Sequence, residues 1–183
     1  MRNNRVLIVL LMVFVVLATV LVTQNSQISD DPPTLARMAN VVFRDFTPDD
    51  IQAIRLRSPE SGETFVISRA TDGTRVWTAP ESAGTLISAE AENIARTIVL
   101  LPVSDTIALP QGDDLATFGF TPEGVLSVEI VLSSGVSHAV AVGYRTPTDD
   151  NYYAIVDDSS EMYLIFRPPI DYLISRLKSP PVA

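Results

Sequence analysis

One uninterrupted apolar segment near the N-terminus constrains this chain more than any other feature. Residues 6–23 read VLIVLLMVFVVLATVLVT, without a charged residue, a proline or a glycine. At about 1.5 Å per residue, a helix of this length spans roughly 27 Å, close to the thickness of the hydrocarbon core of a bilayer. The pattern therefore predicts a single transmembrane helix over residues 6–23.

The charges on either side of this segment predict its orientation. Arg2 and Arg5 precede it, whereas Asp30 and Asp31 follow it. Because basic flanks stay on the cytoplasmic side, we expect residues 1–5 in the cytoplasm and the bulk of the chain outside the cell membrane. A cleaved signal peptide is the alternative, although its apolar region usually has about 7–15 residues and ends at a small-residue site that does not follow here.

The remainder of the chain is acidic. Without Arg2 and Arg5, 11 of the 13 basic side chains remain against 22 acidic ones, a net charge of −11. This balance disfavours nucleic acid and anionic lipid headgroups as direct partners. Every basic residue except Lys178 is arginine, a bias typical of GC-rich bacterial genomes, so we expect a bacterial inner membrane. Residues 24–42 are polar, with Asp-Asp-Pro-Pro at 30–33, and are typical of a stalk.

From Phe43 onward, strand and helix patterns predict a β-rich α+β domain over residues 43–178. Alternating apolar residues bounded by turn signals predict strands over 51–58, 64–68, 75–78, 104–109, 125–132, 137–142, 152–156 and 162–166. Ser88 is a candidate N-cap for a helix whose apolar face runs to Leu101. Pro168 or Pro169 is a candidate first-turn residue of a second helix.

The two halves of this domain resemble each other. Each runs from an antiparallel hairpin through an aromatic-bearing strand to one helix, and the second half has one more strand. Ile51, Ile54 and Leu56 correspond to Val125, Val128 and Ile130 at a spacing of 74 residues. Trp77 corresponds roughly to Tyr152 or Tyr153. We therefore expect two pseudo-repeats, at about 43–102 and 103–178.

Few residues could carry catalysis or bind a metal. The chain has no cysteine, and His138 is its single histidine, placed in a predicted strand where a solvent-facing or hydrogen-bonded role is expected. There is no G-x-S-x-G elbow, Gly-rich phosphate loop or calcium-loop pattern. We therefore expect no catalytic residue, cofactor or metal, and the paired carboxylates (Asp49-Asp50, Asp113-Asp114, Asp149-Asp150, Asp157-Asp158) are expected in solvated turns. A hydrolase that uses such carboxylates remains an alternative.

Four tyrosines gather around the second half and form the candidate interaction surface. They are Tyr144, Tyr152, Tyr153 and Tyr163. Tyrosine is enriched at protein interfaces because it combines an apolar ring with a polar hydroxyl. Adjacent residues of a strand face opposite sides, so Tyr152 and Tyr153 cannot both face one surface, and at least one belongs to the core or an edge.

Short motifs in the second half resemble the domain-of-unknown-function 4340 family. They are Phe118 to Pro122, Val142-Gly143, Thr146-Pro147 and Asn151 to Ala154, together with Val76-Trp77 and Pro80 in the first half. The resemblance covers about residues 43–177 and departs from the usual family pattern at Phe118, in place of tyrosine, and Phe120, in place of leucine.

This resemblance implies a membrane-anchored domain without an assigned enzyme activity. A related region occurs in the auxiliary component of gliding-motility-type ABC transporters. Together with the predicted anchor, it implies a non-catalytic interaction domain that serves a membrane-protein partner, as an accessory of an ABC-transporter-like complex. The alternative is a module that binds a cell-envelope polysaccharide through the tyrosines.

Overall fold

The computed structural model describes residues 40–70, 74–80, 82, 84–110, 112–120 and 124–183. The predicted cytoplasmic N-terminus, transmembrane helix and most of the stalk lie outside the described residues. Within the described part, no helix is both long and apolar enough to span a bilayer.

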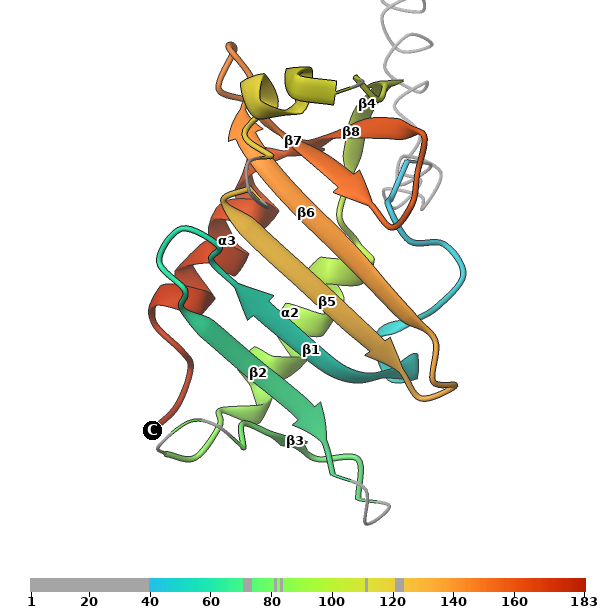
Figure 1. Ribbon diagram of the computed structural model, residues 1–183. Coiled ribbons are helices and arrows are strands. Elements are labelled where there is room, and N and C mark those ends of the chain that lie inside the picture. The colour runs from blue at the N-terminus through green and yellow to red at the C-terminus, as the bar shows by residue number, and fades with distance from the viewer. Residues whose placement is uncertain (1–39, 71–73, 81, 83, 111, 121–123) are drawn as a thin grey trace, which may run out of the picture. The chain divides into compact units, whose positions relative to one another are not determined.

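One eight-stranded antiparallel sheet dominates the described chain (Figure 1). Its order is β3-β2-β1-β5-β6-β7-β8-β4, so β1 of the first half lies beside β5 of the second half. The strands are β1 (Ile51–Arg57), β2 (Thr64–Arg69), β3 (Trp77–Thr78), β4 (Val103–Ala108), β5 (Leu126–Leu132), β6 (Ser137–Arg145), β7 (Asn151–Val156) and β8 (Glu161–Phe166). With two helices, this architecture confirms the predicted α+β class.

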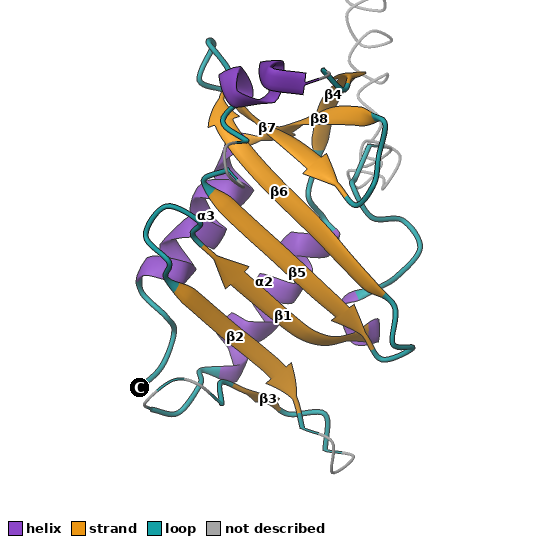
Figure 2. Ribbon diagram, in the orientation of Figure 1, coloured by secondary structure: helices purple, strands orange, loops and turns teal. Residues whose placement is uncertain are grey.

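Both helices, α2 (Ser88–Val99) and α3 (Arg167–Lys178), cover the same face of the sheet (Figure 2). Two short 3₁₀ helices accompany them, η2 (Pro48–Asp50) and η3 (Gly112–Phe118). Alternate residues of the central strands point toward the helices and are almost fully buried, for example Ile54, Val128 and Ile130. Ile94 and Ile170 oppose them from the helices and are also fully buried. The core is therefore a sheet face closed by two amphipathic helices.

The register at the centre of the sheet has a regular pattern. In the β1–β5 pair, Ile54 faces Ile130 and Leu56 faces Val128. Between them, Arg55 faces Glu129, exactly at the spacing of 74 residues noted in the sequence, and the two side chains form an ion pair at 2.8 Å. From β1 the first half continues through β2 and β3 to α2, and from β5 the second half continues through β6, β7 and β8 to α3. Strand β4 precedes β5 and pairs with β8 at the edge of the sheet.

The start of α2 differs from the sequence prediction. Ser88 is the first residue of the helix, and Ile87 is the N-cap, without a side-chain cap hydrogen bond. The reason is tertiary: the Ile87 amide donates to the Pro181 carbonyl at 2.9 Å, and Leu86 forms a β-bridge with Val182. Pairing with the C-terminal residues holds Ile87 extended as the N-cap, so the helix begins at Ser88, one residue earlier than a serine cap would place it.

Strand β6 is longer than the sequence predicts. The sequence predicts its end at Val142, but the strand continues through Gly143 to Arg145. A Cβ atom at Gly143 would lie 2.1 Å from the Phe118 carbonyl oxygen. Glycine is needed here because another backbone segment approaches closely, not because the chain turns. The additional residues bring Tyr144 and Arg145 to the end of the sheet.

Candidate functional site

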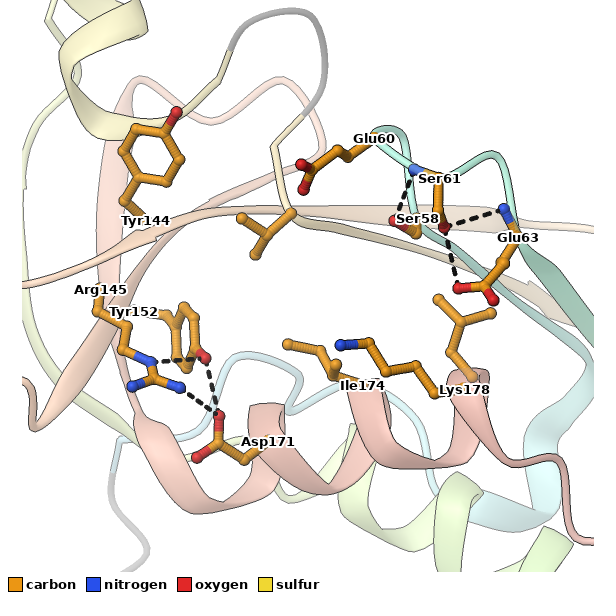
Figure 3. Close-up of a pocket in the computed structure, with 12 residues that line it drawn as sticks. Ser58, Glu60, Ser61, Glu63, Tyr144, Arg145, Tyr152, Asp171, Ile174 and Lys178 are labelled. Carbon is orange, nitrogen blue, oxygen red and sulfur yellow. Dashed lines mark hydrogen bonds and ion pairs between the residues drawn. The ribbon is translucent and has the colours of Figure 1, made fainter.

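The clearest candidate site is a cleft of about 400 Å³ at one end of the sheet, between the β1–β2 turn and α3 (Figure 3). The β1–β2 turn contributes one rim, β6 and β7 contribute the second, and α3 forms the floor. The residues that line it are Ser58, Glu60, Ser61, Glu63, Val125, Tyr144, Arg145, Tyr152, Asp171, Ile174, Leu177 and Lys178. Such a combination of apolar floor and a few polar groups is common in ligand-binding clefts.

Three of these residues, Arg145, Tyr152 and Asp171, are joined by hydrogen bonds and are called here the Tyr152 triad. Arg145 and Tyr152 are cross-strand neighbours at the ends of β6 and β7, and Asp171 is the fifth residue of α3. The Arg145 Nε donates to the Tyr152 hydroxyl at 2.9 Å, and that hydroxyl donates to Asp171 Oδ1 at 2.7 Å. The guanidinium also lies 5.5 Å from the centre of the Tyr152 ring.

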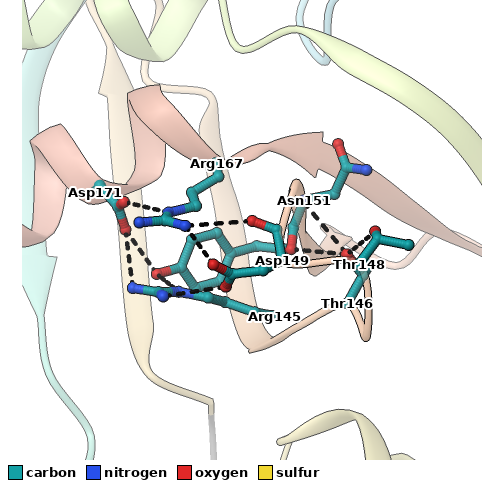
Figure 4. A network of polar contacts seen from close by, with 8 residues as sticks. Arg145, Thr146, Thr148, Asp149, Asn151, Arg167 and Asp171 are labelled. Carbon is teal, nitrogen blue, oxygen red and sulfur yellow. Dashed lines mark hydrogen bonds and ion pairs between the residues drawn. The ribbon is translucent and has the colours of Figure 1, made fainter.

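Two further charged residues extend the triad toward the β6–β7 loop (Figure 4). Arg167 Nε donates to Asp171 Oδ2 at 2.8 Å. The Asp149 carboxylate accepts from Arg145 Nη1 at 3.1 Å and pairs with Arg167 Nη1. Asp149 has a φ of +61°, in the left-handed region that non-glycine residues rarely adopt. The strained backbone places one carboxylate between two guanidinium groups.

The protonation states of the triad follow from these contacts. Burial raises the pKa of Tyr152 above its usual value, and Asp171 adds to this effect. Burial opposes ionisation of Asp171, but hydrogen bonds from Arg167 and Tyr152 outweigh it and lower the pKa of that carboxyl. The Tyr152 hydrogen bond raises the pKa of Arg145. Near neutral pH the phenol therefore stays protonated and the other two groups stay charged, so none exchanges protons readily.

A second, closely similar set of residues lies in the first half and is called here the Trp77 triad. Arg69 and Trp77 are cross-strand neighbours at the ends of β2 and β3, and Glu92 is the fifth residue of α2. Trp77 Nε1 donates to Glu92 Oε2 at 3.1 Å, and Arg69 lies 3.5 Å from the same oxygen. The Arg69 guanidinium lies 4.4 Å from the centre of the indole ring. Both triads thus combine arginine, an aromatic ring and a carboxylate.

The structure does not bring the four candidate tyrosines into one surface. Tyr144 and Tyr152 line the cleft, where Tyr144 is 56% exposed and Tyr152 is buried. Tyr153 packs edge-on against Phe118, with ring centres 4.8 Å apart. Tyr163 lies beside residues 40–46, at two other hollows of the surface. Tyr144 is therefore the candidate that offers its ring to a partner in the cleft.

His138 is the hydrogen-bonded strand histidine expected from the sequence. Its Nδ1 lies 2.8 Å from Asp157 Oδ2, and its ring lies against Phe43 and Phe46, 5.5 and 5.2 Å between ring centres. The other Asp157 oxygen accepts from the Ala139 amide at 2.7 Å. This arrangement ties the chain that enters the domain to the sheet.

Acidic residues do not gather into a metal site in the part of the chain that the structure describes. No group of three or more histidine, aspartate or glutamate side chains there could hold a metal ion. Asp50 caps η2 instead, where hydrogen bonds from Thr47 lower the pKa of its carboxyl.

Sequence reasoning missed Arg145 and Asp171, the charged members of the Tyr152 triad. A signal for them was present: each half carries an arginine at the end of the second strand of its first hairpin, β2 or β6, and a carboxylate at the fifth residue of its helix. Aligning the halves by these charges, and not only by their apolar residues, would have identified both positions. No family model, curated protein or solved structure matches the chain. The resemblance to the 4340 family stays an expectation.

Proposed function

We propose that this chain is a non-catalytic, membrane-tethered interaction domain that binds a segment of a membrane-protein partner in the cleft beside Tyr144. The observation that carries the proposal is the Tyr152 triad: its charged groups satisfy one another and hold the cleft wall in one conformation. A wall organised in this way loses little conformational entropy when a partner binds. An exposed tyrosine next to a charged rim is also common at protein interfaces.

The proposal that the domain is not an enzyme rests on the chemistry of the cleft. Among its lining residues, the pKa of Tyr152 is raised and that of Asp171 is lowered, which moves both away from neutral pH. General acid–base catalysis favours groups with pKa values near the working pH. The hydroxyl of Ser61, for its part, donates to Glu63 at 2.9 Å, and no histidine lines the cleft.

The location of the domain is part of the proposal. Residues 6–23 would cross the bacterial inner membrane, with residues 1–5 in the cytoplasm and residues 24–42 as a stalk. The acidic domain would then stand on the extracytoplasmic side, beside its partner. An accessory role in an ABC-transporter-like complex fits this topology and the family resemblance.

We also infer that the domain arose by duplication of one unit of strands and a helix. Three observations support it: the shared order of elements, the Arg55–Glu129 pair at the sequence spacing of the repeats, and the paired triads. Neighbouring β1 and β5 at the centre of the sheet are related as the two copies of one strand would be around a local two-fold axis.

Photo-crosslinking in native membranes tests the proposed function. A benzophenone amino acid in place of Tyr144 should capture an integral membrane protein, whereas the same amino acid in place of Val136, which is 51% exposed in the β5–β6 turn, should not. Mass spectrometry identifies the captured chain. Monomer alone at both positions, in membranes that contain the natural partners, would overturn the proposal.

A cell-envelope polysaccharide is the second candidate ligand, favoured by the exposed Tyr144 ring beside carboxylates and serine hydroxyls. Aromatic rings of this kind pack against sugar rings, while carboxylates accept their hydroxyl protons. Binding of the full chain to purified envelope glycan should then fall with Tyr144→Ala while the circular dichroism spectrum is unchanged. The matched control is Tyr163→Ala, outside the cleft.

A further inference from the structure

Three polar groups of the cleft lack a partner within the protein. The Lys178 ammonium, the Glu60 carboxylate and the Tyr144 hydroxyl form no hydrogen bond or ion pair among the described residues, whereas Arg145 and Asp171 are saturated by their neighbours. Figure 3 shows Lys178 lying along the α3 side with its ammonium directed into the cleft, and Glu60 facing it from the β1–β2 turn. The cleft thus presents one unpaired cation and one unpaired anion on opposite sides.

From this arrangement we propose that the cleft binds a zwitterionic peptide segment, with a carboxylate on Lys178 and an ammonium or guanidinium on Glu60. This inference rests on the proposed function and narrows it to one partner chemistry. The Arg145–Asp171 pair contributes no net charge, so the unpaired groups decide which charges the ligand needs. Glu63 stands beside Glu60 on the same rim and strengthens the preference for a cation there.

Ligands of one charge sign fit this cleft less well. A purely anionic ligand would meet Lys178 but also two glutamates, on a protein of net charge −9. A purely cationic ligand would meet the glutamates but also the only lysine of the chain. A neutral sugar would leave Lys178 and Glu60 partly desolvated without a counter-charge, which costs binding free energy.

The size and floor of the cleft also suit a short peptide segment. A volume of about 400 Å³ lies in the lower part of the range for small-ligand sites, enough for a few residues. Val125, Ile174 and Leu177 add apolar side chains to the lining of the cleft. A peptide with an acidic and a basic residue separated by an apolar one would match the cleft from side to side.

Charge variants of the crosslinking experiment at position 144 test this inference in the full chain in native membranes. Lys178→Gln and Glu60→Gln should each reduce the yield of the crosslinked partner by about tenfold, the size expected for one lost charge-assisted hydrogen bond. Lys178→Arg, which keeps the charge, should retain most of the yield. Glu60 and Lys178 are both exposed, so neither substitution disturbs the core. Sequencing of the captured segment should find an acidic and a basic residue within about three positions.

Each result separates this inference from the proposed function. If all variants capture the same protein equally well, the proposed interaction domain is supported, but the proposal of a zwitterionic ligand is overturned. If the crosslinking yield falls with only one of Lys178→Gln and Glu60→Gln, the partner carries a single charge at this site, and the proposal of a zwitterionic ligand is again overturned. A crosslinked glycan without peptide would reject both. Failure of the parent protein with the benzophenone at position 144 to capture any partner would overturn the proposed function itself.

Discussion

The Trp77 triad and the Tyr152 triad are built alike but used differently. In each, an arginine at the end of one strand faces an aromatic residue at the start of the next, and the aromatic group donates to a carboxylate on the fifth residue of a helix. Because the aromatic group is an indole in one half and a phenol in the other, only the second offers a hydroxyl that both accepts and donates.

The two arginines explain the difference. Arg69 is 9% exposed and donates to three backbone carbonyls, those of Ile51, Arg75 and Pro48. Arg145 has a side chain that is 44% exposed and bonds to side chains instead. The first arginine ties together the edge of the sheet, η2 and α2. The second forms the wall of an open cleft. One local arrangement thus serves as a structural tie in one half and as a candidate binding site in the other.

Among the substitutions that test this comparison, removal of the Arg69 side chain should cause the largest loss of stability. Arg69→Ala removes the hydrogen bonds from Arg69 to three backbone carbonyls and exposes the indole face, and we expect a loss of about 3 kcal/mol in the free energy of unfolding. Urea unfolding of the full chain in detergent, followed by Trp77 fluorescence, measures it. Arg96→Ala, on the exposed side of α2, is the matched control and should change stability by less than about 0.5 kcal/mol. Equal losses of stability for Arg69→Ala and Arg96→Ala would show that Arg69 does not have this structural role.

Removing the Arg145 side chain should have a smaller effect on stability. Arg145→Ala breaks contacts that water partly replaces, so we expect a loss of about 1 kcal/mol by the same urea titration. Partner capture at Tyr144 should fall at the same time, because Asp149 and Asp171 would then share the single guanidinium of Arg167 and add one net negative charge beside the cleft. A stability loss as large as that of Arg69→Ala would mean that both triads are structural ties.

The Tyr152 triad should also contribute to stability in a pH-dependent way. The pKa of Asp171 is lowered in the folded protein, so the unfolded chain binds its proton more readily. The stabilisation is present above the ordinary pKa of 3.8 and is lost as the pH falls through the lowered folded value. Unfolding titrations between neutral pH and about pH 3 should therefore show a shallower acid loss for Asp171→Asn than for the parent. If stability falls with pH at the same slope in Asp171→Asn and in the parent, the Asp171 carboxylate does not contribute this stabilisation. Hydrogen bonds from Thr47 also lower the pKa of Asp50, so this carboxyl contributes to the acid loss in both proteins.

The smallest effect is expected at the Arg55–Glu129 pair between the two halves. Both side chains are about half exposed, and pairs of this kind typically contribute about 0.2–1 kcal/mol. A double-mutant cycle with Arg55→Ala and Glu129→Ala measures the coupling free energy. A coupling well above this range would show that the centre of the sheet depends on this charge pair more than on the apolar residues around it.

Much of the secondary structure was predictable because it depends on local patterns. Alternation of apolar residues located the strands to within a few residues, and a helical period located α2 and α3. The correspondence of Trp77 with the Tyr152 region also came from spacing alone. Errors occurred where a distant segment intervened: the C-terminal residues set the start of α2 at Ser88, and Phe118 requires the glycine at 143 within a strand.

By itself, the sequence determined the apolar segment, the acidic balance, the β-rich α+β class and the similarity of the two halves, because each is a property of composition or period. The tertiary structure alone decided that β1 lies beside β5, that β4 pairs with β8 at the far edge, and that Arg145 meets Asp171 across 26 positions of chain. These are pairings between distant residues, and local propensity does not encode which partner a strand edge or a charge will find. The cleft exists only once those pairings are made.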